Sequence, residues 1–499
     1  TVHQASVSAH FIIGYEGEII QCVPLDEISY ASNERNDDTI AVESCHPDET
    51  GAYNKAARQY ELPEDMIGDA ARFVACHEVG HSLGLRHNMI ASNAYVTDSL
   101  RSKAFTDKVK GTAASIMDYA RFNYVAQPGD GIKQISPQIG PYDMMAIEWG
   151  YRWFPDEKGA AEKQQAFLKK HSGKEYRYSE AQSQRTAMDP RALSEDLGDD
   201  AMKSASYGIE NLKRVMPNIV EWTRTGEPGQ TYDEASKLYQ GVIFQWSLYL
   251  YHVLANVGGM YIDNTTIDDG KQTFTFVEKD KQKRAVQFLI DEVFTCPKWL
   301  FRSELNKYTF INKNTPLGVQ EQSPDYALQN QQSYMLWDML DNNRIMRMFA
   351  NEQANGKEAF TAVEMMDMLH KHFFGKTIAG RQLTIDERQL QKNFVDALIT
   401  AAAQQEGVKI NKKICDTPAI IDSPAHNWQC VSLSSASRTI DMGGTQTARV
   451  SDAISVKRGE LVRILSLLKG KRRSGDTATQ FHYEDVIMRI QTALGQEIK

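Results

Sequence analysis

The spacing of hydrophobic residues in the first fifty positions is typical of short strands. Phe11 to Tyr15 and Ile19 to Val23 are runs rich in β-branched and aromatic residues, joined by Glu16-Gly17-Glu18. Such a pair of runs around a short glycine-containing turn predicts a β-hairpin. Thr39 to Ser44 has the same composition and predicts a third strand.

Helical spacing begins near residue 62. From Pro63 to Gly84, the apolar residues Ile67, Val74 and Leu83 recur at intervals that place them along a helix. Proline suits the first helical turn, and glycine is a natural residue at which a helix ends. We therefore predict a helix over residues 63–84, followed by a long loop and a second helix before Tyr151.

The remainder of the chain, beyond Trp153, is mostly amphipathic and helical. The predicted helical segments are 198–223, 234–257, 281–296, 324–350, 358–374, 385–405, 455–469 and 479–495. Residues 412–450 are richer in Ser, Thr, Asp and Gly, which predicts a long loop. The expected fold is mainly α with a small α+β N-terminal part, divided into regions 1–54, 55–155, 156–411 and 412–499.

Charge and hydropathy exclude two classes of partner. The net charge of −9 over 499 residues is spread along the chain, which argues against nucleic acid and against an anionic membrane surface. The longest uncharged stretch, Leu238 to Ile262, contains Gln245, His252 and two adjacent glycines. These residues are costly at a bilayer centre, so we expect a buried helix there and no transmembrane segment.

The six cysteines are too few and too scattered for a disulfide scaffold. Cys415 and Cys430 are close enough in sequence to pair in an oxidising compartment, and the sequence leaves their state open. The chain begins at Thr1 without an initiator methionine or a signal peptide, which we interpret as a fragment or a processed form. Nothing in the sequence indicates an oligomeric state.

Three histidines have the spacing of metal ligands. His77 and His81 are four residues apart, so on a helix they share a face and can reach one ion. Gly84 permits the turn that would bring His87 back as a third ligand. Three ligands leave one position for water, which is typical of a catalytic zinc, and Glu78 beside His77 can act as the general base on that water.

The run His77-Glu78-Val79-Gly80-His81-Ser82-Leu83-Gly84-Leu85-Arg86-His87 resembles the extended zinc signature of the metzincin peptidases. Ser115-Ile116-Met117-Asp118-Tyr119 is similar to the Met-turn of that family. The resemblance implies that Met117 forms a hydrophobic base under the histidines and that Tyr119 stabilises the oxyanion. Asp143 to Tyr151 resembles the helix that closes metzincin catalytic domains.

Residues 58 to 499 resemble a group of large bacterial zinc-dependent metzincins, in which a long helical tail follows the peptidase region. The resemblance implies a metzincin-like active-site helix and Met-turn followed by a large helical domain, with Zn²⁺ as cofactor and proteins or peptides as substrates. It also implies export to the periplasm or the cell surface.

The first 54 residues resemble a different family. Ser8 to Phe11, Glu16 to Leu25 and Thr39 to Glu43 are similar to zinc-dependent N-acetylmuramoyl-L-alanine amidases, the relatives of peptidoglycan recognition proteins. Glu43 falls where that family carries a catalytic glutamate, but the other amidase ligands are missing before Lys55. We therefore expect Glu43 to be a solvated strand residue. These strands precede the predicted zinc-binding helix, the place in the sequence where metzincins have the sheet that binds the substrate.

Several further residues have a structural interpretation. We expect Cys76 to be a buried core cysteine, and the pair His370 and His372 to lie on the surface. Helix capping explains the acidic residues from Asp189 to Asp200 better than a calcium site. We expect core packing for three aromatic residues, Trp149, Tyr151 and Trp153. We expect a hydrophobic substrate pocket to be shaped by Phe122, Tyr124 and Val125.

The sequence favours a zinc metalloendopeptidase that uses a zinc-activated water and a glutamate general base. Two alternatives stay open. One is an N-acetylmuramoyl-L-alanine amidase acting on peptidoglycan. The other is a catalytically impaired zinc-binding remnant, because the usual substrate-binding sheet is not recognisable.

Overall fold

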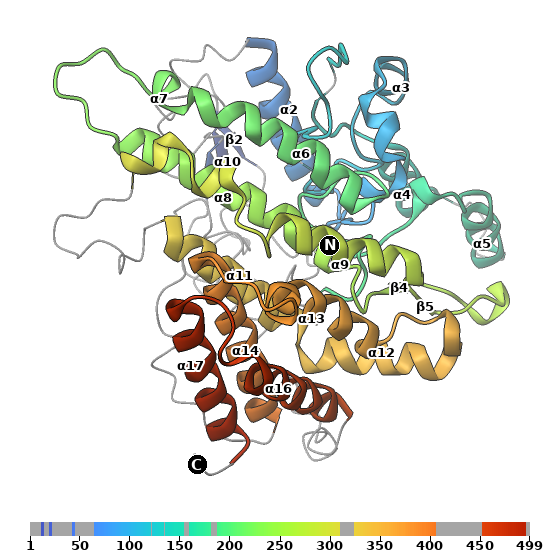
Figure 1. Cartoon of the computed structure of the whole chain (residues 1–499). Coiled ribbons are helices and arrows are strands. Elements are labelled where there is room, and N and C mark those ends of the chain that lie inside the picture. Colours follow the sequence, from blue (N-terminus) through green and yellow to red (C-terminus); the bar gives the residue numbers. More distant parts are fainter. Residues whose placement is uncertain are drawn as a thin grey trace. The chain divides into compact units, whose positions relative to one another are not determined.

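The computed structural model describes most of the chain in residue detail. The described residues are 11–13, 19–21, 42–44, 64–120, 122–133, 135–153, 159–180, 187–309, 324–405 and 452–495. Within these ranges the protein is mainly helical, with a few short strands, as predicted (Figure 1). Cys415 and Cys430 lie outside the described residues.

Three short strands near the N-terminus form a sheet in the order β2-β1-β3. Strand β1 (Phe11–Ile13) pairs antiparallel with β2 (Ile19–Gln21), with Phe11 opposite Gln21. Strand β3 (Val42–Ser44) pairs parallel with β1. The predicted hairpin and third strand are therefore confirmed. The side chain of Glu43 lies outside the part of the chain that is described.

The chain forms two compact units. The first comprises Thr1–Gln184 and Arg191–Val242, and the second comprises Arg185–Pro190 and Ile243–Lys499. The boundary between Val242 and Ile243 falls within the bounds of helix α8 (Asp233–Leu254). The finer division into four regions stays a prediction.

The first unit contains α2 (Glu64–Ser82), which matches the helix predicted over 63–84. Its other elements are 3₁₀ turns at Ser92–Ala94, Thr97–Arg101, Lys174–Tyr176 and Met216–Asn218, and helices α3 (Lys103–Val109), α4 (Pro141–Tyr151), α5 (Ala160–Lys170), α6 (Ala201–Val215) and α7 (Ile219–Trp222). The long loop between α2 and α4 contributes to a hydrophobic core. Its residues Leu100, Ala113, Ala120 and Val125 pack together with Leu197 from the segment before α6, so the loop is a folded part of the unit.

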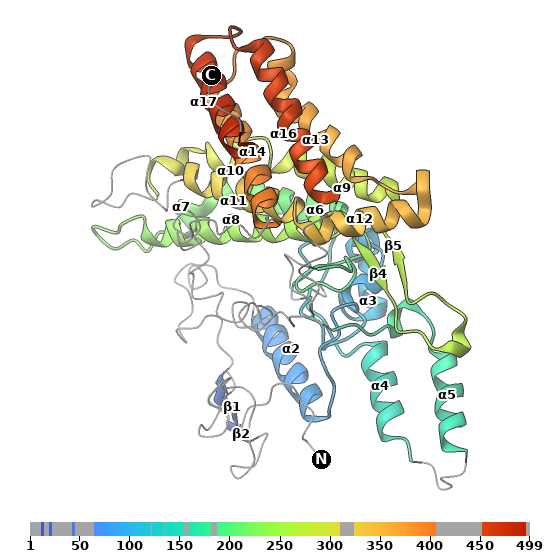
Figure 2. The same cartoon turned by 90° about the horizontal axis from the view of Figure 1, so that it is seen from below.

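The second unit is a helical array. It contains a hairpin of β4 (Met260–Ile262) and β5 (Phe274–Phe276), 3₁₀ turns at Ile267–Asp269, Glu304–Lys307 and Gly356–Glu358, and helices α9 (Lys279–Glu292), α10 (Lys298–Phe301), α11 (Pro324–Met339), α12 (Asn342–Asn355), α13 (Ala362–Ile378), α14 (Ile385–Gln405), α16 (Asp452–Lys471) and α17 (Thr477–Ala493). Helices α13, α14, α16 and α17 lie side by side (Figure 2). The pattern predicted nearly all of these helices.

Two predictions about the helical region are wrong, and one element was not predicted. The segment 324–350 is two helices, because the side chain of Asp341 caps α12 by accepting hydrogen bonds from the backbone N–H groups of Asn343 and Arg344. The β4–β5 hairpin was not predicted. His370 is buried and its Nδ1 lies 2.5 Å from the carboxylate of Glu460, so it is a core residue held by a polar partner.

The aromatic residues around the end of α4 do not pack in the core as predicted. Trp149, Tyr151 and Trp153 are 44%, 63% and 81% exposed. Tyr151 donates a hydrogen bond from its hydroxyl to the carbonyl of Leu83, at 3.0 Å. The N-terminal part of α4 supplies the packing, through buried Met145.

The capping explanation of the acidic loop is confirmed for Asp200. Its side chain accepts from the N–H groups of Met202 and Lys203 at the start of α6. Asp189 accepts from the N–H of Ile262 at 2.7 Å. Cys76 is half-buried and not fully buried in the core as predicted.

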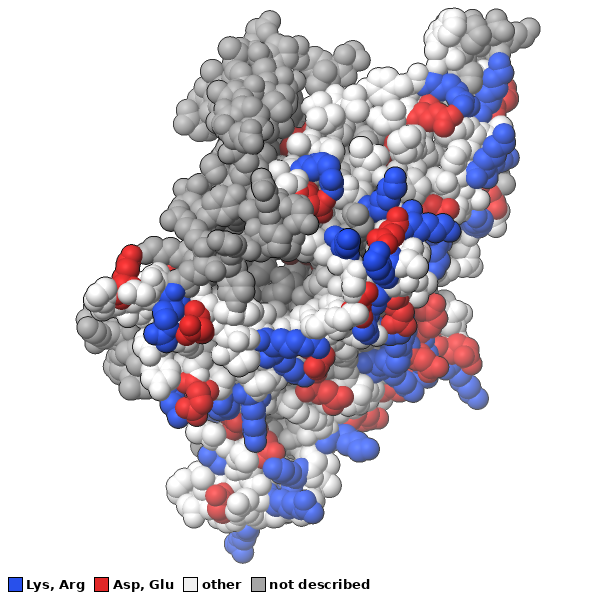
Figure 3. All heavy atoms as spheres, turned by 90° about the horizontal axis from the view of Figure 1, so that it is seen from above, with Lys and Arg blue, Asp and Glu red and all other residues white. Residues whose placement is uncertain are grey.

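No described helix is both long and apolar enough to cross a membrane. The uncharged stretch that begins at Leu238 follows α8 only as far as Leu254, and then turns into β4. Charged side chains of both signs are interspersed over the face shown in Figure 3.

Arg344 connects α12 to the C-terminal end of α8. Its guanidinium is buried and donates to the carbonyls of Leu254, at 2.9 Å, and Val257, and to that of Asp338, at 2.8 Å. The last carbonyls of a helix lack partners within the helix, so a buried helix end needs such donors. Burial lowers the pKa of Arg344 to about 10, which leaves it charged at neutral pH.

Replacing Arg344 with Met should lower the free energy of unfolding by about 3 kcal/mol or more, because buried carbonyls lose their donors. Urea denaturation followed by circular dichroism measures the change. Arg381→Met, at an exposed position, is the control and should have little effect. Equal losses in the two variants would contradict this role of Arg344.

Candidate metal centre

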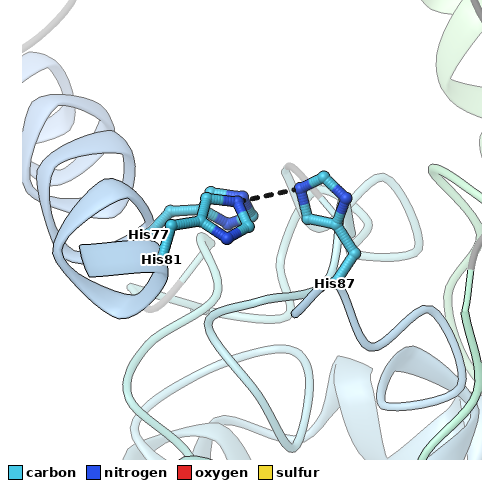
Figure 4. Close-up of side chains that lie close together, drawn as sticks. All are labelled: His77, His81 and His87. Carbon is cyan, nitrogen blue, oxygen red and sulfur yellow. Dashed lines mark hydrogen bonds between the residues drawn. The ribbon is translucent and has the colours of Figure 1, made fainter. Parts of the chain in front are cut away.

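The structure brings the three predicted histidines together. His77 and His81 project from α2, and His87 faces them from the loop that follows (Figure 4). One ring nitrogen from each can be chosen such that all lie within 4.8 Å of one another. The Nε2 atoms of His81 and His87 are 3.1 Å apart. No other cluster of three such ligand residues occurs in the part of the chain that the structure describes.

The end of α2 is shaped so that His87 can return. The N–H of Leu85 donates to the carbonyl of Gly80, and that of Gly84 donates to the carbonyl of His81, at 3.0 and 2.8 Å. Gly84 has φ of +84°, the left-handed conformation in which a side chain is strained. This pair of bonds is a Schellman motif, and it reverses the chain within a few residues.

Backbone carbonyls orient two of the imidazoles. Nδ1 of His81 donates to the carbonyl of Leu85 at 2.9 Å, and Nδ1 of His77 donates to the carbonyl of Ile116 at 2.8 Å. A histidine that donates from one ring nitrogen presents the other as a lone pair. The Nε2 atoms of both residues are therefore the ones available to a metal ion.

The environment keeps the histidines neutral. Burial, and then repulsion from His81, lowers the pKa of His77 to about 4. Burial, and then repulsion from His81 and His77, lowers the pKa of His87 to about 3. Burial also lowers the pKa of His81. Neutral imidazoles bind cations, so the site is ready for a metal at neutral pH.

The donor set fits zinc. Zinc–nitrogen bonds of ~2.0–2.1 Å in a tetrahedral site place neighbouring ligand nitrogens about 3.3 Å apart. The Nε2 atoms of His81 and His87 are at 3.1 Å, close to that spacing. Three imidazole nitrogens are also a usual donor set for catalytic zinc.

Met117 lies directly against α2. It is fully buried, and a Cβ atom placed on Gly80 would collide with its Sδ atom. Gly80 thus lets the Met117 side chain approach the helix next to His81. The backbone on either side is fixed, because the carbonyl of Met117 accepts from the N–H of Asn88 at 3.0 Å.

Asp143 holds the turn that contains Met117. Its carboxylate accepts from the Ser115 hydroxyl at 2.5 Å and from the N–H groups of Ile116 and Gly140 at 2.7 Å each. Burial raises the pKa of Asp143. The sequence placed Asp143 at the start of the closing helix but did not predict this role. The signal was an acidic residue at the third position of a helix that opens with Gly140 and a proline.

The ring of Tyr119 packs against two of the histidines. Its centroid lies 5.4 Å from that of His77 and 4.5 Å from that of His87. It also packs on a buried cluster that includes Met89. Glu78 follows His77 in α2 and is half-buried.

The expected hydrophobic pocket after Tyr119 is reduced to one residue. Val125 is fully buried in the core cluster, and the Tyr124 hydroxyl accepts from the N–H of Leu197 at 3.2 Å. Only Phe122 is exposed among the three residues proposed.

Comparison with known families agrees with this geometry. The sequence profile described as Met-zincin matches residues 59–380, well over half of the chain. The chain belongs to the Met-zincin family. Met-zincins depend on zinc, so Zn²⁺ is the cofactor of this protein, and the family supports a zinc metalloprotease in general.

A second profile, N-acetylmuramoyl-L-alanine amidase, matches residues 1–97 of this Met-zincin. The amidase similarity predicted for residues 1–54 is thus present, and it extends further than expected. It overlaps the Met-zincin match across the segment that carries the three histidines. No curated protein and no solved structure matches the chain.

The metal-free protein should lose stability in acid. The pKa of His77 is about 4 in the folded protein and 6.5 in the unfolded chain, so the unfolded chain binds a proton first as the pH falls. Stability is full above pH 6.5 and declines toward pH 4, by about 3 kcal/mol for this residue. Urea denaturation of the metal-free protein across this range measures the slope. The slope should be shallower in His77→Leu, and an unchanged slope would contradict the assignment.

Gly80→Ala should weaken zinc binding by roughly tenfold or more, because the new Cβ displaces Met117 beneath the ligands. Competition with a chelator measures the affinity. Gly68→Ala is the matched control in the same helix, where an added Cβ meets nothing within 4 Å. The double variant Gly80→Ala/Met117→Ala should recover part of the loss, and no recovery would mean that Met117 is not the cause.

Proposed function

We propose that this Met-zincin is a zinc metalloendopeptidase with His77, His81 and His87 as ligands. The observation that carries the proposal is the convergence of three neutral imidazoles within 4.8 Å, two of them oriented through Nδ1 by backbone carbonyls. Such a set leaves room for a substrate oxygen, which distinguishes catalytic from structural zinc sites.

Residues of the chain carry out the proton transfer and stabilise the oxyanion. Bound Zn²⁺ supplies a Lewis acid that polarises the scissile carbonyl and lowers the pKa of water. Glu78 takes the proton from the attacking water and delivers it to the departing amide nitrogen. The Tyr119 hydroxyl donates to the oxyanion, with its ring held against His77 and His87. Met117 packs against α2 next to the ligands, and Gly84 forms the turn that brings His87 back toward them.

The substrates in this proposal are proteins or peptides, bound along the zinc region of residues 55–155. The exposed ring of Phe122, a few residues after Tyr119, favours an apolar side chain beside the scissile bond. By resemblance to exported bacterial metzincins, we place the activity in the periplasm or at the cell surface. The helical regions 156–411 and 412–499 carry no proposed chemistry.

A second candidate is an N-acetylmuramoyl-L-alanine amidase, favoured by the profile match over residues 1–97. Both activities hydrolyse an amide bond with zinc, so the substrate distinguishes them. Release of muropeptides that survives the loss of His77 would favour the amidase. Zinc binding at one equivalent, with neither activity, would favour the impaired remnant.

Glu78→Gln should reduce peptide cleavage by about 10²–10⁴-fold, because the amide cannot accept the proton. The variant should still bind one zinc per chain, since Glu78 is not among the three ligands. Cleavage of a peptide library and zinc stoichiometry are measured on the same samples. Glu162→Gln, at an exposed position in α5, is the control. Full activity in Glu78→Gln would refute the mechanism.

A further inference from the structure

Asn88, the residue after the third histidine, is completely buried and makes bonds in two directions. Its side-chain Nδ2 donates to the carbonyl of Arg177 at 2.8 Å, and its Oδ1 accepts from the N–H of Ser179 at 3.0 Å. The adjacent Met89 donates its N–H to the carbonyl of Ser179 at 2.9 Å. The side-chain amide of Asn88 and the backbone N–H of Met89 thus form three successive hydrogen bonds between residues 88–89 and 177–179.

On its other side Asn88 is bonded to the Met-turn. Its backbone N–H donates to the carbonyl of Met117, and the N–H of Ala114 donates to the carbonyl of Ala91 at 3.1 Å. The third-ligand loop therefore lies between the Met-turn and the segment of residues 177–180, with hydrogen bonds to both. The ion pair of Arg86 with Glu180, 2.8 Å long, joins the same segments but is half-exposed, so it contributes little.

His87 differs from the other two ligands in how it is held. His77 and His81 each donate Nδ1 to a backbone carbonyl, whereas no described carbonyl accepts a hydrogen bond from the His87 ring. His81 and His77 also stand on a helix, which fixes their backbone. The direction of the His87 side chain therefore depends on the loop backbone at residue 88, together with the packing of Tyr119 against its ring.

We propose that Asn88 is a positioning residue for His87, and that residues 177–180 belong to the support of the metal site. The proposal rests on the zinc site of the proposed function. A buried side chain with both polar atoms bonded fixes the backbone that carries it, and with it the adjacent ligand. The region that builds the site then extends beyond residue 155, to a segment ninety residues away from the ligand in sequence.

The test uses the full chain and compares Asn88→Ala with a matched control. Asn93→Ala removes an asparagine from the same loop, which donates to a distant carbonyl, that of Gly198, at 3.2 Å. Zinc affinity is measured by chelator competition, and the geometry of the site by the absorption spectrum of the Co²⁺-substituted protein. Asn88→Ala should bind zinc roughly 10–100-fold more weakly and change the Co²⁺ spectrum, while Asn93→Ala should change neither.

A second variant removes the same hydrogen bond by changing the donor residue. Ser179→Pro lacks the backbone N–H that donates to Oδ1 of Asn88, and it leaves the carbonyl of residue 179 and the zinc motif intact. It should weaken zinc binding and alter the Co²⁺ spectrum in the same direction as Asn88→Ala, and it provides the test if that variant does not fold.

The outcomes separate this inference from the proposed function. If wild type binds one zinc and cleaves peptides, but Asn88→Ala and Ser179→Pro keep its affinity and spectrum, Asn88 is not a positioning residue. If wild type binds no zinc at all, the proposed site fails, and this inference fails with it.

Discussion

The site depends on the hydrogen bonds that fix two imidazoles through their Nδ1 atoms. Without the carbonyls of Ile116 and Leu85, the rings of His77 and His81 could rotate, and their Nε2 atoms would not share one point in space. Burial adds the second requirement. It disfavours the protonated form of His77 and His87, so the ligands are neutral when a cation arrives. The folded chain thus supplies both the geometry and the protonation state that a set of metal-binding imidazoles requires.

These bonds are in turn fixed by segments that follow in the chain. Asp143, at the start of α4, accepts a hydrogen bond from the backbone N–H of Ile116, and the carbonyl of Ile116 accepts one from His77. The backbone of Ile116 therefore joins the carboxylate of Asp143 to the imidazole of His77. Asn88 performs a corresponding task for the loop that carries His87. The candidate metal centre is a product of the folded unit, although its three histidines lie within only eleven residues of sequence.

Two family profiles overlap on the segment that carries the ligands. The Met-zincin profile covers residues 59–380 and the amidase profile residues 1–97. The three-stranded sheet of β1, β2 and β3 belongs only to the amidase-like part. In metzincins a sheet before the active-site helix binds the substrate backbone by strand addition.

The sequence by itself determined the local features of the protein. The positions of α2 and of most later helices follow from apolar spacing, because helix formation depends on neighbours three and four residues away. The same holds for the pairing of His77 with His81 and for the turn at Gly84. Only the tertiary structure decided which carbonyls orient the rings of His77 and His81. The same holds for the support of the site by Asp143 and Asn88, and for the exposure of Trp153. These are contacts between residues far apart in sequence, and no periodicity in the chain records them, because they arise when distant segments pack and exclude water.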